Sequence, residues 1–322
     1  MINWDHYKAG NWQPKEQYAF KILSIDGGGM KGIIPAYYLK QVEDSIGGPI
    51  HKHFDLLTGT STGGIICLGL TSGMSAEEIA NLYINEGTQI FGKKRASGYI
   101  KNASYSNNPL KNLLIEKFAN KKIRDANTML CVPSIEHHKA EPNVFKTPHH
   151  PDYIRDGERY MWEVGLATSA APSYFPAANI GDGECKIDGG LWANNPVLVG
   201  IAEAKKLGYS LDQIKVLSIG TGDSLYNAPN KIAEAGGLLS WKKNLVELTM
   251  QAQSKGAWHT AKYLIGENLI RLNPILTRPI PLDSTSEDDF SIMIREANHM
   301  FERTFVAQGV KEMFFQATAI LQ

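Results

Sequence analysis

The stretch "SIDGGGMKG" at residues 24–32 decides the fold, because three consecutive glycines follow a short apolar run and precede a helical pattern. The run FKILSI (20–25) is rich in apolar and β-branched residues, which predicts a buried strand. The sequence KGIIPAYYLKQVEDSIGG (31–48) has helical periodicity and ends in glycines, which commonly close a helix. Strand, glycine loop and helix in this order indicate the first unit of a mainly parallel α/β sheet.

The glycine loop fits two kinds of site. Gly27, Gly29 and Gly32 have the spacing of a dinucleotide fingerprint, whereas an unbroken glycine run also suits backbone amides that stabilise an anion. A dinucleotide site needs an acid about 20 residues later, at the end of the second strand, to bind the ribose. Glu43 falls inside the predicted helix, however, and Asp55 opens the second strand. The sequence therefore favours the anion-stabilising use over an NAD-binding oxidoreductase.

A second strand-turn-helix unit contains a candidate nucleophile. GTSTG (59–63) matches G-x-S-x-G and lies between a predicted buried strand, FDLLTG (54–59), and a predicted helix. Gly59 and Gly63 allow the chain to turn sharply, and the positive end of the following helix favours negative charge at Ser61. This context predicts that Ser61 is a catalytic nucleophile.

A nucleophilic serine needs a base. His259 and His299 are the histidines that come late enough for a Ser, acid, His order, but both lie inside helical patterns, so a histidine triad is unsupported. Asp188 in KIDGGLWANNP is better placed, because it ends a predicted strand and is followed by Gly189 and Gly190. We expect its side chain at the carboxyl edge of the sheet.

Strands and helices continue to alternate up to about residue 222. The further predicted segments are a helix from Ser75, a strand at 128–135, a helix at 160–170, a strand at 185–190, a helix at 195–208 and a strand at 214–222. Beyond these, two long helical stretches (238–264 and 287–321) are joined by a connector with several prolines (271–283). We predict a single domain over residues 1–322, with an α/β core at about 18–222 and a helical C-terminal region at about 223–322.

Three motifs in this order resemble those of the patatin-like phospholipases: DGGGMKG (26–32), GTSTG (59–63) and DGG (188–190). ATSAAPSYFPAA (167–178) and VLSIGTG (216–222) resemble the same family. The resemblance covers roughly residues 18 to 222. It implies a three-layer α/β/α patatin-like fold.

The resemblance also implies a lipid acyl hydrolase that acts on membrane glycerophospholipids through a serine–aspartate dyad. Ser61 would be the nucleophile and Asp188 its base, in a partly desolvated site that raises the pKa of the carboxyl. The oxyanion hole would be built from the amides of Gly27, Gly28, Gly29 and Met30. Lys31 would fill a basic position that is more commonly Arg, keeping the charge without the bidentate fork. No metal or organic cofactor is needed.

The charges of the chain balance but are unevenly placed. Lys plus Arg number 33, as do Asp plus Glu, so the total charge does not favour a DNA or RNA polymer as partner. Nine basic residues face one acid, Glu116, in a single segment: Lys93, Lys94, Arg95, Lys101, Lys111, Lys117, Lys121, Lys122 and Arg124. Residues 283–289 hold four acids. One interpretation of the basic and acidic segments is ordinary solvated surface. The functional alternative is an interfacial surface for phospholipid membranes around Lys93, Lys94 and Arg95.

Compartment and regulation follow from simpler features. The N-terminus lacks a secretory pattern, the three cysteines have no CxxC spacing, and no apolar run is long enough to span a bilayer. We expect a cytoplasmic protein that associates peripherally with the inner face of the membrane. Its length and lack of repeats resemble bacterial anti-phage effectors of the same family that cyclic di- or trinucleotides switch on. Constitutive lipid turnover, a toxin, a non-catalytic storage or binding protein and a homo-oligomer remain open.

Overall fold

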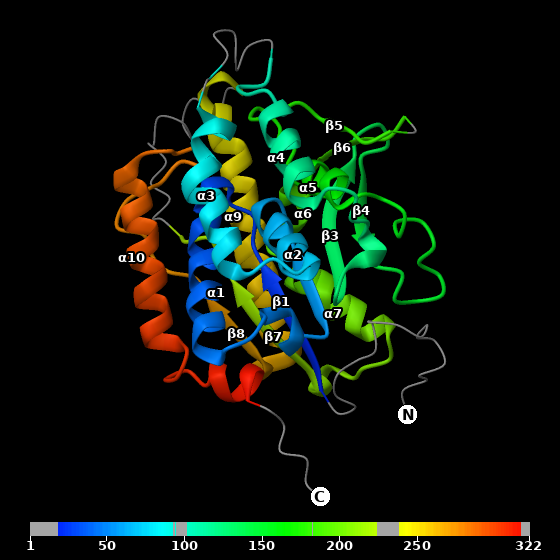
Figure 1. The fold of residues 1–322 in the computed structure, drawn as a ribbon, viewed down its shortest axis with the longest axis vertical. Coiled ribbons are helices and arrows are strands. Elements are labelled where there is room, and N and C mark those ends of the chain that lie inside the picture. The colour runs from blue at the N-terminus through cyan, green and yellow to red at the C-terminus, as the bar shows by residue number, and fades with distance from the viewer. Residues whose placement is uncertain (1–18, 93, 95–101, 182, 224–237, 317–322) are drawn as a thin grey trace, which may run out of the picture.

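The computed structural model describes residues 19–92, 94, 102–181, 183–223 and 238–316 (Figure 1). Its centre is a mixed sheet with the strand order β5-β6-β3-β2-β1-β7-β8, and β4 pairs with β3 outside this path. The strands are β1 (Phe20–Ile25), β2 (Leu56–Gly59), β3 (Met129–Glu136), β4 (Glu141–Lys146), β5 (Ala178–Asn179), β6 (Cys185–Asp188), β7 (Ile214–Ile219) and β8 (Leu269–Leu272).

The register of the sheet brings two of the sequence motifs to one edge. β1 pairs in parallel with β2 and β7, and Ile25 lies level with Gly59 and Ile219. The loops after these three strands therefore leave the same edge, where ligands of open α/β sheets bind. β6 runs antiparallel to β3, with Asp188 opposite Ser134. The chain thus enters β6 from beyond this edge, and Asp188, the last residue of β6, lies two positions past the level of Gly59, where β2 ends.

Helices cover both faces of the sheet, and β1 shows why. Its side chains alternate between the faces: Leu23 and Ile25 join one apolar core, and Phe20 and Ile22 join the other. The helices are α1 (Ile33–Ile46), α2 (Thr62–Ser72), α3 (Ala76–Phe91), α4 (Asn108–Phe118), α5 (Met161–Thr168), α6 (Gly190–Ala193), α7 (Val197–Lys206), α9 (Leu238–Ile265) and α10 (Glu287–Thr304). In Figure 1, α1, α2 and α3 lie toward the viewer and α9 lies behind the strands. The predicted three-layer, mainly parallel fold is confirmed.

The C-terminal region is mostly helical, and it also contributes one strand that the sequence did not predict. β8 overlaps the start of the predicted connector and pairs in parallel with β7, with Leu269 opposite Val216. Its sequence, LIRL, is too short to carry a strand signal, so the pairing with β7 decides its conformation. The second predicted helical stretch is interrupted, because α10 ends at Thr304 and a separate helical turn follows at Lys311–Phe315.

Candidate active site

Ser61 lies in a strained turn between β2 and α2. Its backbone has φ 54° and ψ −121°, a conformation that residues with a side chain rarely adopt. The turn is tight enough that a side chain at Gly59 would collide with the Gly63 carbonyl, and one at Gly63 with the Ile25 carbonyl. The Ser61 N–H donates to Thr168 Oγ1 at 2.9 Å, which holds the turn in place. Strain of this kind persists where the surroundings enforce it, commonly at active sites.

Asp188 lies on β6, which runs against its neighbour β3. Its pairing with Ser134 places it beyond the last residue of β2, at the expected carboxyl edge, and it is buried, with 1% of its surface exposed. Its Oδ1 accepts the Gly190 N–H at 2.7 Å, so the glycine pair after Asp188 orients the carboxyl. Its Oδ2 is buried and accepts no hydrogen bond from the described residues.

The environment of Asp188 shifts its pKa toward neutrality. Burial, the largest influence, raises the pKa to about 7 from an ordinary value of 3.8, while the Gly190 N–H and the Ser61 hydroxyl lower it. The hydroxyl is therefore close to the carboxyl without having closed a hydrogen bond to Oδ2. A carboxyl with this pKa is about half ionised at neutral pH, which suits a group that must both take and return a proton.

The glycine loop offers fewer free amides than the four that were predicted. The Gly27 N–H donates to the Asn194 carbonyl at 2.9 Å, and the Met30 N–H donates to the Leu282 carbonyl at 2.8 Å. The N–H groups of Gly28 and Gly29 donate to none of the described residues. Two of the four amides are thus engaged by partners distant in sequence, and two are available to a ligand.

The loop lies directly against Ser61. A β-carbon on Gly27 would be 3.3 Å from that of Ser61, and a side chain on Gly28 would collide with Thr221. Gly29 has φ +58°, and a side chain there would collide with the Leu282 carbonyl. The three consecutive glycines are therefore needed for close approach on three different sides.

Asp26, at the start of the loop, is held by a residue that the sequence analysis missed. Arg271 from β8 donates to its two carboxylate oxygens at 2.7 and 2.6 Å, and Ser254 from α9 donates to Oδ2 at 2.5 Å. Arg271 also donates to Ser218 Oγ on β7 at 2.8 Å. This buried bidentate pair fixes where the glycine loop leaves the sheet.

Lys31 is buried at the other end of the loop. Burial lowers the pKa of its ammonium group, and the more distant charges of Glu247 and Asp223 act in the opposite direction. Lys31 does not line the apolar cavity that contains Ser61, so its role beside an anion stays a prediction.

An apolar cavity opens from the site. Ser61, Asp188 and Gly29 line one end, together with Met250 and Leu282. The other walls come from α2, α3 and α4 and carry mostly aliphatic and aromatic side chains. A strained serine, an adjacent carboxyl and two free amides thus lie beside an apolar cavity, which suits an ester with a long acyl chain.

The family model described as patatin-like phospholipase matches residues 23–201. The chain belongs to the patatin-like phospholipase family. The predicted hydrolase class is confirmed, and these phospholipases are hydrolases of lipid esters. The oxidoreductase alternative is not supported.

The patatin-like phospholipases most similar to this one include three bacterial proteins, each named cGAMP-activated phospholipase. The relative from Pseudomonas aeruginosa is 33% identical over 279 residues, which cover 85% of this chain and 84% of the relative. The Vibrio cholerae relative is 28% identical over 340 residues, covering 93% and 95%. The Escherichia coli relative is 32% identical over 256 residues, covering 72% of each chain.

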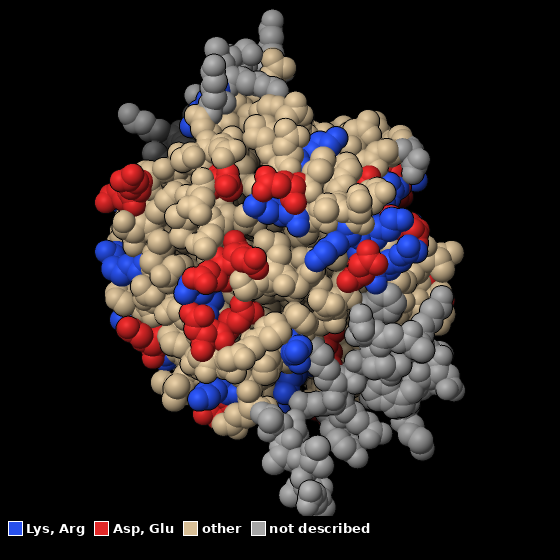
Figure 2. Space-filling model, in the orientation of Figure 1, with Lys and Arg blue, Asp and Glu red and all other residues tan. Residues whose placement is uncertain are grey.

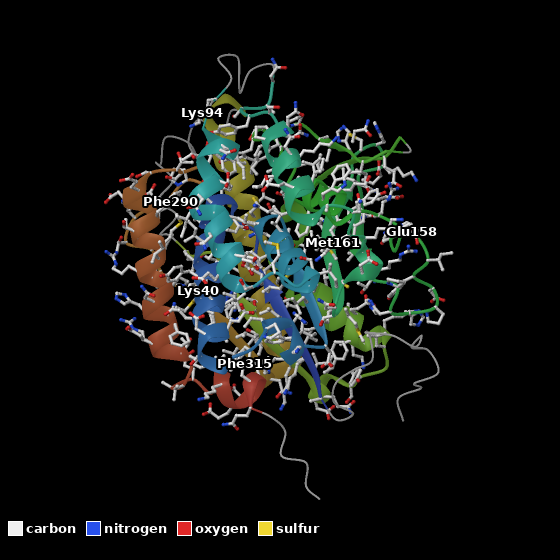
Figure 3. The ribbon with its side chains drawn as sticks, viewed as in Figure 1. Lys40, Lys94, Glu158, Met161, Phe290 and Phe315 are labelled. Atoms are coloured by element: carbon white, nitrogen blue, oxygen red, sulfur yellow. The ribbon has the colours of Figure 1, made fainter. Side chains whose placement is uncertain are left out.

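The described residues of the basic segment of this patatin-like phospholipase are mostly paired with acids. Lys94 lies at the end of α3 (Figure 3), and its ammonium group is 3.4 Å from Asp283, in the acidic segment. Lys122 and Arg124 both pair with Glu158. Figure 2 shows the same mixture, with blue and red side chains next to one another over the visible face. Lys93 and Arg95 lie outside the described residues, so the interfacial hypothesis stays a prediction.

Two further features concern cofactors and membranes. The described part of the phospholipase contains no cluster of three or more His, Cys, Asp and Glu side chains that could hold a metal ion. None of its described helices combines the length and the apolar character needed to cross a bilayer.

Proposed function

We propose that this enzyme hydrolyses acyl esters of membrane glycerophospholipids, with Ser61 as nucleophile and Asp188 as base. One observation carries the proposal: a buried carboxylate oxygen without a hydrogen bond among the described residues belongs to the group that interacts with the strained Ser61. Buried polar atoms are nearly always hydrogen-bonded, so such an atom is expected where a reaction needs an acceptor. Asp188 Oδ2 would accept the proton of Ser61.

The reaction would proceed in two halves. Ser61 Oγ attacks the ester carbonyl and passes its proton to Asp188, while the oxyanion receives the N–H groups of Gly28 and Gly29. When the carbon–oxygen bond of the ester breaks, Asp188 returns the proton to the lysophospholipid oxygen. Water then attacks the acyl-enzyme with Asp188 as base, and the fatty acid leaves as Ser61 regains its proton.

Activity of this kind inside a cell requires control. The named activation of three similar proteins by cGAMP supports a cyclic dinucleotide as the activator of this chain, in a role in anti-phage defence. The membrane would be reached peripherally, through a surface that includes Lys93, Lys94 and Arg95. Constitutive lipid turnover is the competing use, and it predicts activity without any nucleotide.

Two experiments test the proposal. A fluorophosphonate probe should label the wild type covalently and leave Ser61→Ala unlabelled, and Asp188→Asn should label at a strongly reduced rate. Equal labelling of all three proteins would contradict the dyad. Release of fatty acid from a fluorogenic phospholipid should require cGAMP; equal rates without it would leave the hydrolase intact and contradict the activation.

A further inference from the structure

The apolar cavity extends from Ser61 along helix α2, and we call this part of the cavity the tunnel. Ser61, Ile65 and Gly69 line it at intervals of four residues, so one stripe of α2 forms a wall along the helix axis. With a rise of about 1.5 Å per residue, the distance from Ser61 to Gly69 is about 12 Å. Met74, after the end of α2, and Ile79 on α3 also line the cavity.

The walls of this tunnel are mostly aliphatic and aromatic, which favours an apolar ligand group. On α4 the lining side chains include Leu110, Leu114 and Phe118, all buried. Lys117 also lines the cavity, and its ammonium group pairs with Glu116 at 2.7 Å. A polar group carried into this space would lose its hydration without compensation, so the chemistry fits a saturated or unsaturated hydrocarbon chain.

The length of the tunnel corresponds to a number of acyl carbons once Ser61 carries an acyl group. Carbon–carbon bonds of about 1.5 Å at tetrahedral angles advance about 1.25 Å per carbon, so about ten carbons reach from Ser61 to Gly69. Longer chains must pass Gly69 and enter the space beside Met74 and Ile79. Gly69 therefore lies where medium and long acyl chains begin to differ.

Gly69 is also where the tunnel would close. A β-carbon there would lie 2.8 and 2.9 Å from two carbons of Ile79 and 3.6 Å from the Met74 sulfur. Any side chain at this position must displace Ile79 or fill the passage. A glycine in a helix interior costs about 1 kcal/mol of stability relative to alanine, so its presence at position 69 is consistent with a requirement for space.

We propose that Gly69, opposite Ile79 and Met74, determines the longest acyl chain that this enzyme accepts. The inference rests on the proposed acyl hydrolase function and specifies its substrate class. Gly69 allows Ile79 to pack directly against α2, and a side chain at 69 would displace Ile79, which lines the cavity. A larger residue at 69 should select shorter chains, and a smaller residue at 79 should admit longer ones.

The test compares chain-length profiles. Wild type, Gly69→Val and Ile79→Ala are assayed with cGAMP on p-nitrophenyl esters from C4 to C18 and on matched phosphatidylcholines. The ratio of C16 to C8 hydrolysis should fall about tenfold or more in Gly69→Val. It should rise in Ile79→Ala. Ile66→Ala is the matched control, because Ile66 on α2 is equally buried but does not line the cavity.

The outcomes separate the inference from the proposed function. A wild type that cleaves none of the esters would overturn the hydrolase itself. A wild type that cleaves them, with the same C16-to-C8 ratio in both tunnel variants as in Ile66→Ala, would overturn the inference alone. If Gly69→Val does not fold, Ile79→Ala decides, since it removes atoms and forces no collision.

Discussion

Asp188 and Glu203 are two buried carboxylates in opposite surroundings. Glu203, on α7, accepts hydrogen bonds from Lys146 at 2.5 Å and Tyr153 at 2.6 Å, and His149 lies 3.1 Å from it. Burial alone would raise its pKa, but His149 and Lys146 bring the pKa down to about 2. Asp188 has one backbone N–H on one oxygen and no hydrogen bond from described residues on the other.

The number of hydrogen bonds that a buried carboxylate accepts distinguishes a structural carboxylate from one that can exchange a proton. A fully satisfied buried carboxylate keeps its charge over a wide pH range and contributes to the packing of its surroundings. An incompletely satisfied one is destabilised as an anion and therefore binds a proton near neutral pH. This comparison supports a structural role for Glu203 and the proposed proton transfer at Asp188.

The largest expected effect is on catalysis. Asp188→Asn keeps the shape of the side chain but removes the proton acceptor, so kcat should fall about 10⁴-fold. Glu203→Gln should leave kcat within a few-fold in the protein that remains folded. Initial rates on a fluorogenic phospholipid with cGAMP measure both; comparable losses in the two variants would remove the distinction.

The second effect is on stability and belongs to Glu203. Glu203→Gln leaves the Lys146 ammonium group without its partner, and breaking such a buried pair costs about 3–5 kcal/mol. Chemical denaturation of the variant should show this loss. Glu302→Gln, at an exposed position of α10, is the control and should change the free energy of unfolding little.

The third effect is the pH dependence of the free energy of unfolding that Asp188 causes. Because its pKa is raised from 3.8 to about 7 by folding, the folded chain binds the proton more tightly than the unfolded chain. The stability that this tighter proton binding gives the folded chain is present below pH 3.8 and is lost as the pH rises to about 7. Asp188→Asn should therefore gain stability relative to wild type between these values, by up to about 4 kcal/mol. A difference that is constant with pH would contradict the raised pKa.

The fourth effect is the pH dependence of the rate. The proposed mechanism requires the base form of Asp188, so kcat/KM should rise about tenfold per pH unit at low pH and level off above about 7. A profile with its midpoint near 4 would mean that the carboxyl is not desolvated in the working enzyme.

The parts of the site that the sequence predicted are those with a local signal. Ser61 and Asp188 each lie beside glycines that a tight turn requires, so a few adjacent residues reveal them. Arg271 has no such signal, because its role depends on the pairing of β8 with β7. The sequence of β8 is compatible with a connector until that pairing is known.

The oxyanion loop shows the same limit at the level of single amides. Its glycines predict close approach, but they do not tell which N–H groups remain free. The partners of Gly27 and Met30 are the carbonyls of Asn194 and Leu282, which are more than 150 residues away along the chain. Only the folded arrangement separates the engaged amides from those of Gly28 and Gly29.

The smallest expected effect is a change in kcat on replacing Asp283. The surroundings of this carboxylate are intermediate between those of Asp188 and Glu203. Its side chain is buried and accepts the Tyr105 hydroxyl at 2.8 Å, whereas its ion pair with Lys94 lies at the surface. The neighbouring Leu282 carbonyl holds the Met30 N–H of the glycine loop. Asp283→Asn weakens this support without removing a reacting group, so kcat should fall a few-fold while the pH midpoint of the rate stays at its wild-type value. Asp288→Asn, at an exposed ion pair with Arg278, is the control; an equal loss there would mean that Asp283 has no particular link to the loop.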